Sequence, residues 1–482
     1  MPFNSVQYFL FLPLVYLVFY CVPDRARWGV LLAASLCFYS ALKVPYLPAV
    51  LALVTLVTYA FGIWVDGART QGAKRAFLWS GIAANVSILV GMKYLPFLSE
   101  NLGTLAKLFS PGADVTPVQA LVAIGVSYYV SQAISYLFDI YLEIDTPERH
   151  LGYFALHLAF FPKLLQGPIE RSCDLIPQLR EKYLFNYENA RLGMLLFTWG
   201  LFKKVVVADR IAPYVDNVYN NVHAFKGLPL LLATYAYSFQ IFFDFSGYTD
   251  MALGSALLFN IRLTQNFNRP YLATSVADFW RRWHISFSRW ILDYIFKPLQ
   301  MQWRSLKNWG SAAALVIAFL VSGIWHGASW GFVIWGGLHG MFMACSIFYK
   351  PYQKKLHKAL GMEKTKLLKW WQVFVTFNLV SFAWIFFRAA TLADAWYVAS
   401  NLFNGADGMK EAFLFLRSHE LTMTLVSVAI FVLLSALFRQ EKLQQLFAKS
   451  AFKRYLAYNS LLFSLILLAK YGATKSFIYF QF

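Results

Sequence analysis

The fold is decided by two stretches of sequence, SVADFWRRWHISFSRWILDYIF at 275–296 and VSGIWHGASWGFVIWGGLHG at 321–340. Residues 310–349 contain no Asp, Glu, Lys or Arg, which leaves room for two passes of about 20 residues each, or one broken pass. His326 and His339 lie inside this run. An ionisable group at membrane depth costs about 2.5 to 3.5 kcal/mol on insertion scales, so it usually faces a cavity or a partner. His326 is therefore the first candidate for chemistry.

The stretch before it has the pattern of an amphipathic helix. Between Trp280 and Ile295, apolar residues recur at three- and four-residue steps, while the charged residues take the other side. This spacing predicts one helix at the membrane interface, with His284 in its apolar stripe. Ser275 followed by Asp278 is typical of the capping box that begins a helix. In the alternative interpretation, the tryptophans mark headgroup depth and His284 is only a core residue.

Composition sets the class of protein. Of 482 residues, 59% are hydrophobic and 14% are charged, which indicates a polytopic, all-α membrane protein in contact with membrane lipid. The net charge of +19 falls in short loops between apolar spans, as the positive-inside rule requires, so we expect no nucleic-acid partner. The four cysteines lack metal-type spacing, and we expect no metal site and no disulfide framework.

The apolar segments predict about ten to twelve transmembrane or re-entrant helices. They are 5–22, 28–42, 47–65, 76–97, 118–141, 151–167, 191–208, 228–260, 311–349, 370–388, 420–438 and 456–471. The first segment has no signal-peptide features, so we expect it to be retained. We find no repeat and no soluble domain, which predicts a single domain over 1–482. Within it, 1–150 are N-terminal helices, 151–349 the catalytic core and 350–482 C-terminal helices.

Loop charge predicts the orientation of these helices. The link 350–369 carries seven lysines against Glu363, and the link 439–454 is also basic, so both are expected in the cytoplasm. The link 405–420 is net acidic and is expected on the opposite side. Both termini are then extracytoplasmic.

Two further features interrupt the apolar segments. Gly167-Pro168 is expected to break the helix over 151–166 and to start a short re-entrant element, whose backbone lines a cavity or is buried in protein. Asp244 and Asp250 lie in a segment otherwise as apolar as a span, so they need partners. Four arginines are nearby in the sequence, and an ion-pair cluster is favoured over direct chemistry; the arginines are Arg262, Arg269, Arg281 and Arg282.

The two histidines of the charge-free run differ in their expected surroundings. Thirteen residues at about 100° each place His326 and His339 roughly 140° apart, so they share no face unless the backbone breaks. Gly336-Gly337 is the expected place for such a break. Trp330 follows His326 by one turn and is expected to help form an aromatic wall. His339 lies among glycines, as in helix-packing sequence, and ranks below His326.

Several of these motifs together resemble the membrane-bound O-acyltransferase family, and within it the branch that acetylates alginate in bacteria. The resemblance rests on QNFNRPYLATSVADFWRRWHISFSRW at 265–290 and SGIWHGASWGFVIWGGLHG at 322–340. It extends over nearly the whole chain through GVSYYVSQAISYLFDIY at 125–141, FFPKLLQGPIERS at 160–172, YSFQIFFDFSGYTDMALG at 237–254 and FIYFQF at 477–482.

The resemblance implies helices around a central tunnel and a catalytic role for His326, the histidine of the Trp-His-Gly motif. It also implies that His284 lies near the same tunnel. Further candidates for lining the tunnel are Trp325, Trp330, Trp283, Asp244 and Gln166.

The chemistry of acyl transfer agrees with this assignment. Transfer from a thioester to a hydroxyl needs a base, and neutral imidazole, with an ordinary pKa of about 6.5, suits that role. General-base catalysis contributes roughly 10² to 10⁴-fold. We expect no tightly bound cofactor, but a donor on the cytoplasmic face: acetyl-CoA or a phosphopantetheine-carried acyl group.

The resemblance also implies the acceptor and the place of the reaction. It implies that the acyl group is an acetyl group. This group moves from the cytoplasmic donor across the bacterial inner membrane toward an extracytoplasmic polysaccharide such as alginate. An extracytoplasmic acyltransferase or esterase-like partner protein completes the transfer. Peptidoglycan O-acetylation and teichoic-acid D-alanylation are the alternatives within the family.

Two rival interpretations remain. GASWG at 327–331 has the letters of a GxSxG nucleophile elbow at Ser329, but that elbow needs a strand-to-helix turn rather than an apolar membrane run. Direct attack of the acceptor on the thioester is therefore favoured over an acyl-enzyme. From another class, a transporter or flippase with a proton-relay histidine would be favoured by an inverted repeat, which we do not find.

Overall fold

Helices are the only regular elements in the part of the chain that the structure describes. This computed structural model describes residues 1–110, 118–182, 184–363, 365–405, 407–410 and 451–469, with a few single positions beyond. Six helical stretches among them are long and apolar enough to cross a membrane: Tyr46–Gly67, Gln71–Lys93, Leu228–Leu257, Arg304–His326, Trp330–Ala359 and Lys366–Arg388. The prediction of an all-α polytopic membrane protein is confirmed.

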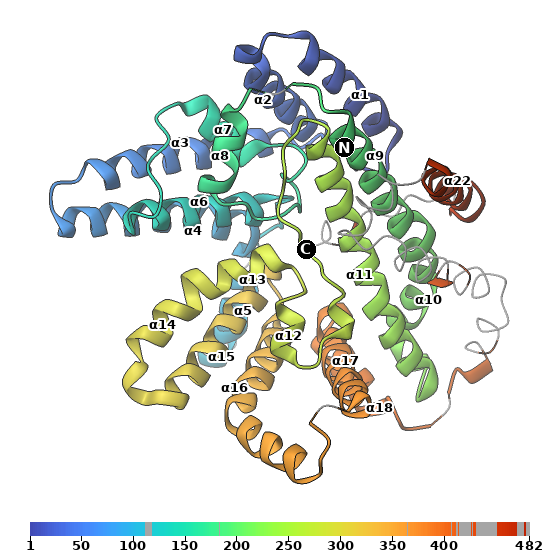
Figure 1. Cartoon of the computed structure of the whole chain (residues 1–482). Coiled ribbons are helices and arrows are strands. Elements are labelled where there is room, and N and C mark those ends of the chain that lie inside the picture. The colour runs from blue at the N-terminus through green and yellow to red at the C-terminus, as the bar shows by residue number, and fades with distance from the viewer. Residues whose placement is uncertain are drawn as a thin grey trace.

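The N-terminal helices follow the predicted apolar segments closely. They are α1 Val6–Cys21, α2 Asp24–Ser40, α3 Tyr46–Gly67, α4 Gln71–Lys93, α5 Leu95–Phe109 and α6 Val126–Tyr141. The predicted segment 76–97 is divided, because α4 ends at Lys93 and α5 begins at Leu95. In Figure 1, α1 and α2 lie together at the top, and α3 and α4 extend together to the left and pack on α6.

The middle of the chain alternates helices with buried non-helical backbone. Its helices are α7 Leu151–Ala159, α8 Ser172–Arg180, α9 Tyr187–Phe202, a π-helical turn Lys203–Ala208, α10 Asp209–Tyr219, a 3₁₀ turn Val222–Ala224 and α11 Leu228–Leu257. The helix predicted over 151–166 ends early, at Ala159, and residues 160–170 are all buried. Their backbone is satisfied by other segments: the N–H of Phe161 donates to Ser35 Oγ at 3.0 Å, and that of Ile169 to Ser286 Oγ at 3.0 Å. As expected, this non-helical backbone is buried in protein.

The amphipathic stretch is not one helix, and this corrects the prediction. It forms a 3₁₀ turn Pro270–Leu272, α12 Val276–Trp280, α13 Ile285–Ile291, a π-helical turn Leu292–Phe296, α14 Lys297–Gln302 and a 3₁₀ turn Arg304–Leu306. The chain turns at His284, whose φ of 44° and ψ of 54° are left-handed.

The cause of this break is a tertiary contact. Asn266 accepts the first two amides of the new helix, through its carbonyl oxygen from Ile285 (3.0 Å) and its Oδ1 from Ser286 (3.0 Å). These amides would bond to the preceding turn in a continuous helix. The predicted start is correct, because the N–H of Asp278 donates to Ser275 Oγ at 3.1 Å.

The charge-free run forms two passes, one of the two arrangements predicted. The remaining helices are α15 Lys307–His326, α16 Trp330–Ala359, α17 Lys366–Arg388, α18 Leu392–Asn401 and α22 Ala451–Leu468. The break lies between His326 and Trp330 and not at Gly336-Gly337, where we expected it. Gly323 and Gly336 instead let α15 and α16 approach closely, because a Cβ at either position would collide with a carbonyl oxygen of the other helix. The predicted span 420–438 lies outside the described residues.

The arrangement leaves non-helical segments at the centre. In Figure 1, α9, α10 and α11 form the right side and α12 to α17 lie below, while the chain between α11 and α12 crosses the middle. The buried turn after α7 and the turn at His284 meet through the hydrogen bond between Ile169 and Ser286. The predicted break after α7 and the unpredicted turn at His284 are thus in contact.

Candidate active site

His326 is the last residue of α15, and its side chain is enclosed by aromatic rings. The residue is 4% exposed. Its imidazole centroid lies 4.9 Å from Trp325, 4.9 Å from Trp335, 5.3 Å from Phe387 and 5.7 Å from Phe287. The surroundings are therefore aromatic, as predicted, but they are built from α13, α15, α16 and α17 together.

The end of α4 holds the helix end that carries His326. Lys93 Nζ donates to the carbonyl oxygens of His326 (2.9 Å) and Trp325 (3.1 Å), and the Tyr94 hydroxyl donates to that of Ile324 (2.6 Å). The last carbonyls of a helix have no partner within it, and a cation there also interacts favourably with the helix dipole. We did not single out these residues from the sequence. One feature of the sequence could have indicated Lys93: it is the one charged residue of the apolar segment 76–97.

His284 lies in the same aromatic cluster. It is 1% exposed, and its ring centroid is 4.8 Å from Phe245, 5.1 Å from Phe287 and 6.1 Å from Trp325. Since Phe287 and Trp325 contact both imidazoles, the structure brings His284 and His326 together. Neither ring nitrogen of His284 has a hydrogen-bond partner among the described residues.

His339 lies on the other side of Trp335. That indole contacts His326 at 4.9 Å and His339 at 5.1 Å. The two histidines approach one indole because the backbone breaks at 327–329, where Gly327 is extended. His339 is fully buried and its Nδ1 accepts from Trp280 Nε1 at 3.2 Å, which is an arrangement typical of a packed core histidine.

The predicted tryptophans occupy three different places. Trp325 is in the cluster, and its Nε1 donates to Ser131 Oγ at 3.0 Å. Trp283 lies deeper, against Phe267 (5.1 Å) and Trp384 (5.2 Å). Trp330, expected beside His326, is 53% exposed and instead donates to Asn101 Oδ1 at 3.1 Å. The reason is the break before it, since Trp330 begins a new helix and does not follow His326 on the same one.

Asp244 and Asp250 are paired with lysines. Lys204 Nζ lies 2.6 Å from Asp244 and 3.0 Å from Asp209, and Lys203 Nζ lies 2.5 Å from Asp250. Both lysines come from the π-helical turn after α9. The favoured ion-pair interpretation fits this geometry, but the expected arginine partners are wrong. Two of the four, Arg281 and Arg282, pair with Asp278.

Gln166 contributes an unpaired amide at the centre. It is fully buried, and neither its Oε1 nor its Nε2 has a partner among the described residues. The same holds for Asn266 Nδ2 and for the hydroxyl of Tyr128, whose ring is 6.2 Å from His284. A buried polar group left unpaired costs about 1 to 3 kcal/mol, so these atoms favour a bound molecule with polar groups of its own. We call these unpaired polar groups of Gln166, Asn266 and Tyr128 the polar wall. Asn266 is next to His284 because it bonds the N–H of Ser286, and Gln166 lies three residues before Ile169, whose N–H donates to Ser286 Oγ.

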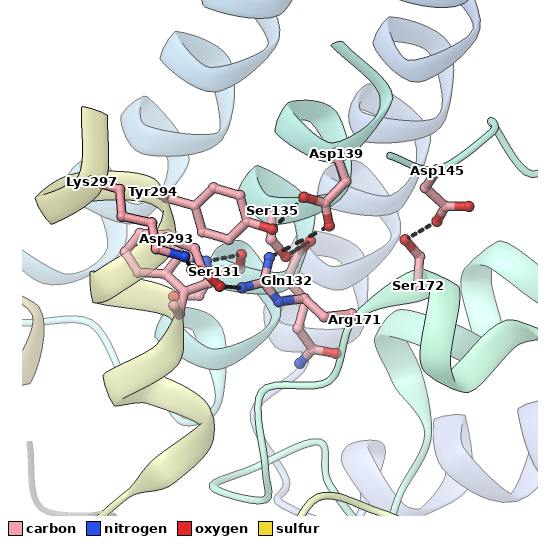
Figure 2. Close-up of polar contacts among 11 residues, drawn as sticks. Ser131, Gln132, Ser135, Asp139, Asp145, Arg171, Ser172, Asp293, Tyr294 and Lys297 are labelled. Carbon is pink, nitrogen blue, oxygen red and sulfur yellow. Dashed lines mark hydrogen bonds and ion pairs between the residues drawn. The ribbon is translucent and has the colours of Figure 1, made fainter. Parts of the chain in front are cut away.

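A polar network anchors the segment after His284, as Figure 2 shows. Asp139 of α6 accepts from the Tyr294 hydroxyl at 2.5 Å and lies 3.5 Å from Arg171, which also pairs with Asp293 at 2.8 Å. Lys297 reaches the other oxygen of Asp293 at 2.7 Å. Burial raises the pKa of Asp139 to about 6, and the Arg171 guanidinium opposes that rise. The network fixes the π-helical turn between α13 and α14 on α6.

The fold and this site define a class: a polytopic helical membrane protein with a buried pair of histidines at its centre. Among the described residues, no group of three or more His, Cys, Asp and Glu side chains is placed to hold a metal ion. The chain belongs to the membrane-bound O-acyltransferase (MBOAT) family, and the family model matches residues 149–387. That range contains both His284 and His326. The protein is accordingly an acyltransferase.

Relatives with named activities match most of the chain. It is 34% identical to the peptidoglycan O-acetyltransferase of Helicobacter pylori, over 82% of this chain and 78% of the relative. It is 36% identical to the probable alginate O-acetylase AlgI of Azotobacter vinelandii, over 84% and 78%. Identity to the teichoic acid D-alanyltransferase of Bacillus subtilis is 30%, over 68% and 83%. The predicted resemblance to the family and to its alginate branch is confirmed.

Proposed function

We propose that this protein moves an acetyl group from a thioester on the cytoplasmic face of a bacterial inner membrane toward hydroxyls of an extracytoplasmic polysaccharide such as alginate. The donor is acetyl-CoA or a phosphopantetheine-carried group. The observation that carries the proposal is the buried histidine pair, His284 and His326, on shared aromatic rings. The names of two relatives, a peptidoglycan O-acetyltransferase and a probable alginate O-acetylase, support the acetyl group and the polymer acceptor.

In the proposed reaction, His326 is the general base. Its imidazole takes the proton of the acceptor hydroxyl while the hydroxyl oxygen attacks the thioester carbonyl carbon. The carbon–sulfur bond then breaks, and the imidazolium returns the proton to the leaving thiolate, so the base is regenerated. Enclosure by Trp325, Trp335 and Phe387 supports this role, because a site without water strengthens electrostatic interactions with the developing charge.

Ser329 has a structural role that supports direct attack. Its Oγ accepts from the N–H of Gly331 at 3.2 Å and caps the start of α16. The Ser329 hydroxyl oxygen is thus engaged by the N–H of Gly331, and Ser329 lies on the turn that leads away from His326. An acyl-enzyme at Ser329 is therefore not needed for the reaction.

The polar wall suits the rest of the substrate. Gln166 and Asn266 offer amide donors, and Gln166 also offers an acceptor, beside the histidine pair. We place polar groups of the donor arm or the acceptor there, because either would satisfy atoms that are otherwise buried and unpaired. His284 then contacts substrate and assists His326.

Orientation follows from loop charge. The basic link 350–369 lies on the cytoplasmic face, and both termini lie outside. In this arrangement α4 runs from the cytoplasmic face to the extracytoplasmic face, so Lys93, at its end, lies toward the extracytoplasmic side. Because Lys93 bonds His326, this histidine lies toward the same side of the core. An extracytoplasmic acyltransferase or esterase-like partner then completes transfer to the polymer.

A specific observation favours a second acceptor. The relative from Helicobacter pylori acts on peptidoglycan and matches this chain about as well as the alginate relatives do. The experiment that decides is mass analysis of surface polymers from cells with and without the protein. If cells without the protein lose acetyl groups from peptidoglycan alone, the acceptor is peptidoglycan and not alginate. Unchanged acetylation of every polymer would contradict the proposal.

The crossing step has its own test. The purified protein is reconstituted in sealed vesicles, with labelled acetyl-CoA at the cytoplasmic face and an acceptor with its partner protein trapped opposite. We expect label on the opposite side. Label found only on acceptors on the donor's own side would show that the acyl group does not cross.

A further inference from the structure

The last carbonyl groups of α15 are hydrogen-bonded in an unusual way. Helices commonly end with a left-handed glycine whose N–H bonds back to the last turn. Gly327 follows α15, but its φ of 178° is extended, and its N–H reaches only Ile324, at 3.2 Å. The carbonyls of Trp325 and His326 therefore depend on a partner from elsewhere.

Lys93 is that partner. Its Nζ lies 2.9 Å from the carbonyl oxygen of His326, 3.1 Å from that of Trp325 and 3.4 Å from Ser127 Oγ. The three acceptors come from two helices, so a single ammonium group joins α4 and α6 to the end of α15. A cation at a helix C-terminus is also favoured by the helix dipole.

Lys93 bonds directly to the backbone carbonyl of His326, the proposed base. Lys93 and His326 are 233 residues apart in the sequence, and the lysine donates to the His326 carbonyl at 2.9 Å. By contrast, the Tyr94 hydroxyl bonds Ile324 at 2.6 Å and lies 3.5 Å from the Trp325 carbonyl. The two neighbours on α4 thus hold the same helix end at different residues.

We propose that Lys93 is a positioning residue for the transfer reaction: its ammonium group fixes the backbone of His326, and with it the place of the imidazole between Trp325 and Trp335. The inference rests on the proposed role of His326 as general base. Lys93 itself touches neither substrate nor reacting atom. A displacement of the base by about 1 Å can cost on the order of 100-fold in rate.

The test compares steady-state kinetics of full-length variants with acetyl-CoA as donor and an oligomannuronate as acceptor. We expect Lys93→Met to lower kcat by roughly 10- to 100-fold while KM for acetyl-CoA changes by about twofold or less. Lys93→Arg keeps a cation and should recover most of kcat. Lys93→Gln keeps a hydrogen-bond donor without the charge, and its kcat should lie between those of the other two variants. It replaces Lys93→Met in the comparison if the methionine variant does not fold.

Tyr94→Phe is the matched control, because it removes a bond to the same helix end but none to His326. It should lower thermal stability, as Lys93→Met does, and keep kcat within about threefold of wild type. Equal losses of kcat in the two variants, or a normal kcat in Lys93→Met, would overturn the positioning role. His326→Ala is measured alongside: if it stays active, the proposed base is wrong, whereas an inactive His326→Ala with an active Lys93→Met contradicts only the role of Lys93.

Discussion

His284 and His326 lie against one indole, with the centroid of Trp325 at 6.1 Å from the first imidazole and 4.9 Å from the second. The two histidines come from different segments, the turn before α13 and the end of α15, and each is almost fully buried. Trp325 is itself held by Ser131 of α6 through its Nε1. Three segments of the chain therefore meet at this ring.

The first prediction is that His326→Ala lowers acyl transfer by at least about 100-fold, the range expected for loss of a general base. His284→Ala should also impair activity, though less, because it assists and does not take the proton. Turnover is measured on purified protein that elutes as a folded species. Trp330→Phe is the matched control, since Trp330 is half-exposed and bonds Asn101, and it should retain near-normal activity. Wild-type turnover in His326→Ala would remove this histidine from the reaction.

Much of this fold could be predicted from the sequence, because hydropathy acts locally. Continuous apolar runs predicted α1 and α17 to within a few residues, and the long charge-free run predicted the α15 and α16 passes. The charge-free surroundings of His326 also pointed to the site. Each of these inferences used residues that are neighbours along the chain.

The remaining features depend on contacts between distant segments. The turn at His284 forms because Asn266 takes the first amides of α13, which periodicity alone does not reveal. Trp330 points away from His326 because the break falls at Gly327 and not at Gly336. Lys93 reaches His326 across 233 residues, and the lysines beside Asp244 and Asp250 belong to another helix.

A second prediction concerns the buried pair of Lys204 and Asp244, at 2.6 Å. Removing one partner leaves a buried charge uncompensated, which costs about 3 to 5 kcal/mol. Lys204→Met should therefore lower the thermal midpoint in detergent strongly. The exposed pair of Lys74 and Glu143 is the control, and Glu143→Gln should change the thermal midpoint little, because solvent screens an exposed ion pair. If the two variants lose equal stability, the buried pair stabilises the fold no more than the exposed pair does.

A third prediction tests the orientation from loop charge. Single cysteines are placed in a variant whose four native cysteines are replaced, because all four are exposed. A cysteine near Lys358 or Lys449 should be shielded from an impermeant reagent added to intact spheroplasts. One near Ala412 or after Phe482 should be labelled. Of these positions, only Lys358 lies in the part of the chain that the structure describes, near the end of α16. Labelling at Lys358 from outside would reverse the orientation and the direction of transfer.

The last prediction follows from the raised pKa of Asp139 in the network of Figure 2. Burial raises this pKa from 3.8 to about 6, against the attraction of Arg171. Between these two values the folded protein binds more protons at Asp139 than the unfolded chain does. The contribution of Asp139 to stability is therefore full below pH 3.8 and is lost as the pH rises through about 6.

Asp139→Asn should remove this part of the pH dependence, because the amide does not titrate. Its single oxygen can still accept from Tyr294, but its NH2 group cannot accept from Arg171 as the second carboxylate oxygen does. The measurement is the thermal midpoint in detergent between about pH 4 and 7, the window set by the two pKa values. Asp139→Glu keeps a carboxyl group and is the control, so it should keep a decline in stability with rising pH. Identical pH profiles for wild type and Asp139→Asn would show that the carboxyl does not titrate in this window, and the network would then stabilise the site by packing and hydrogen bonding alone.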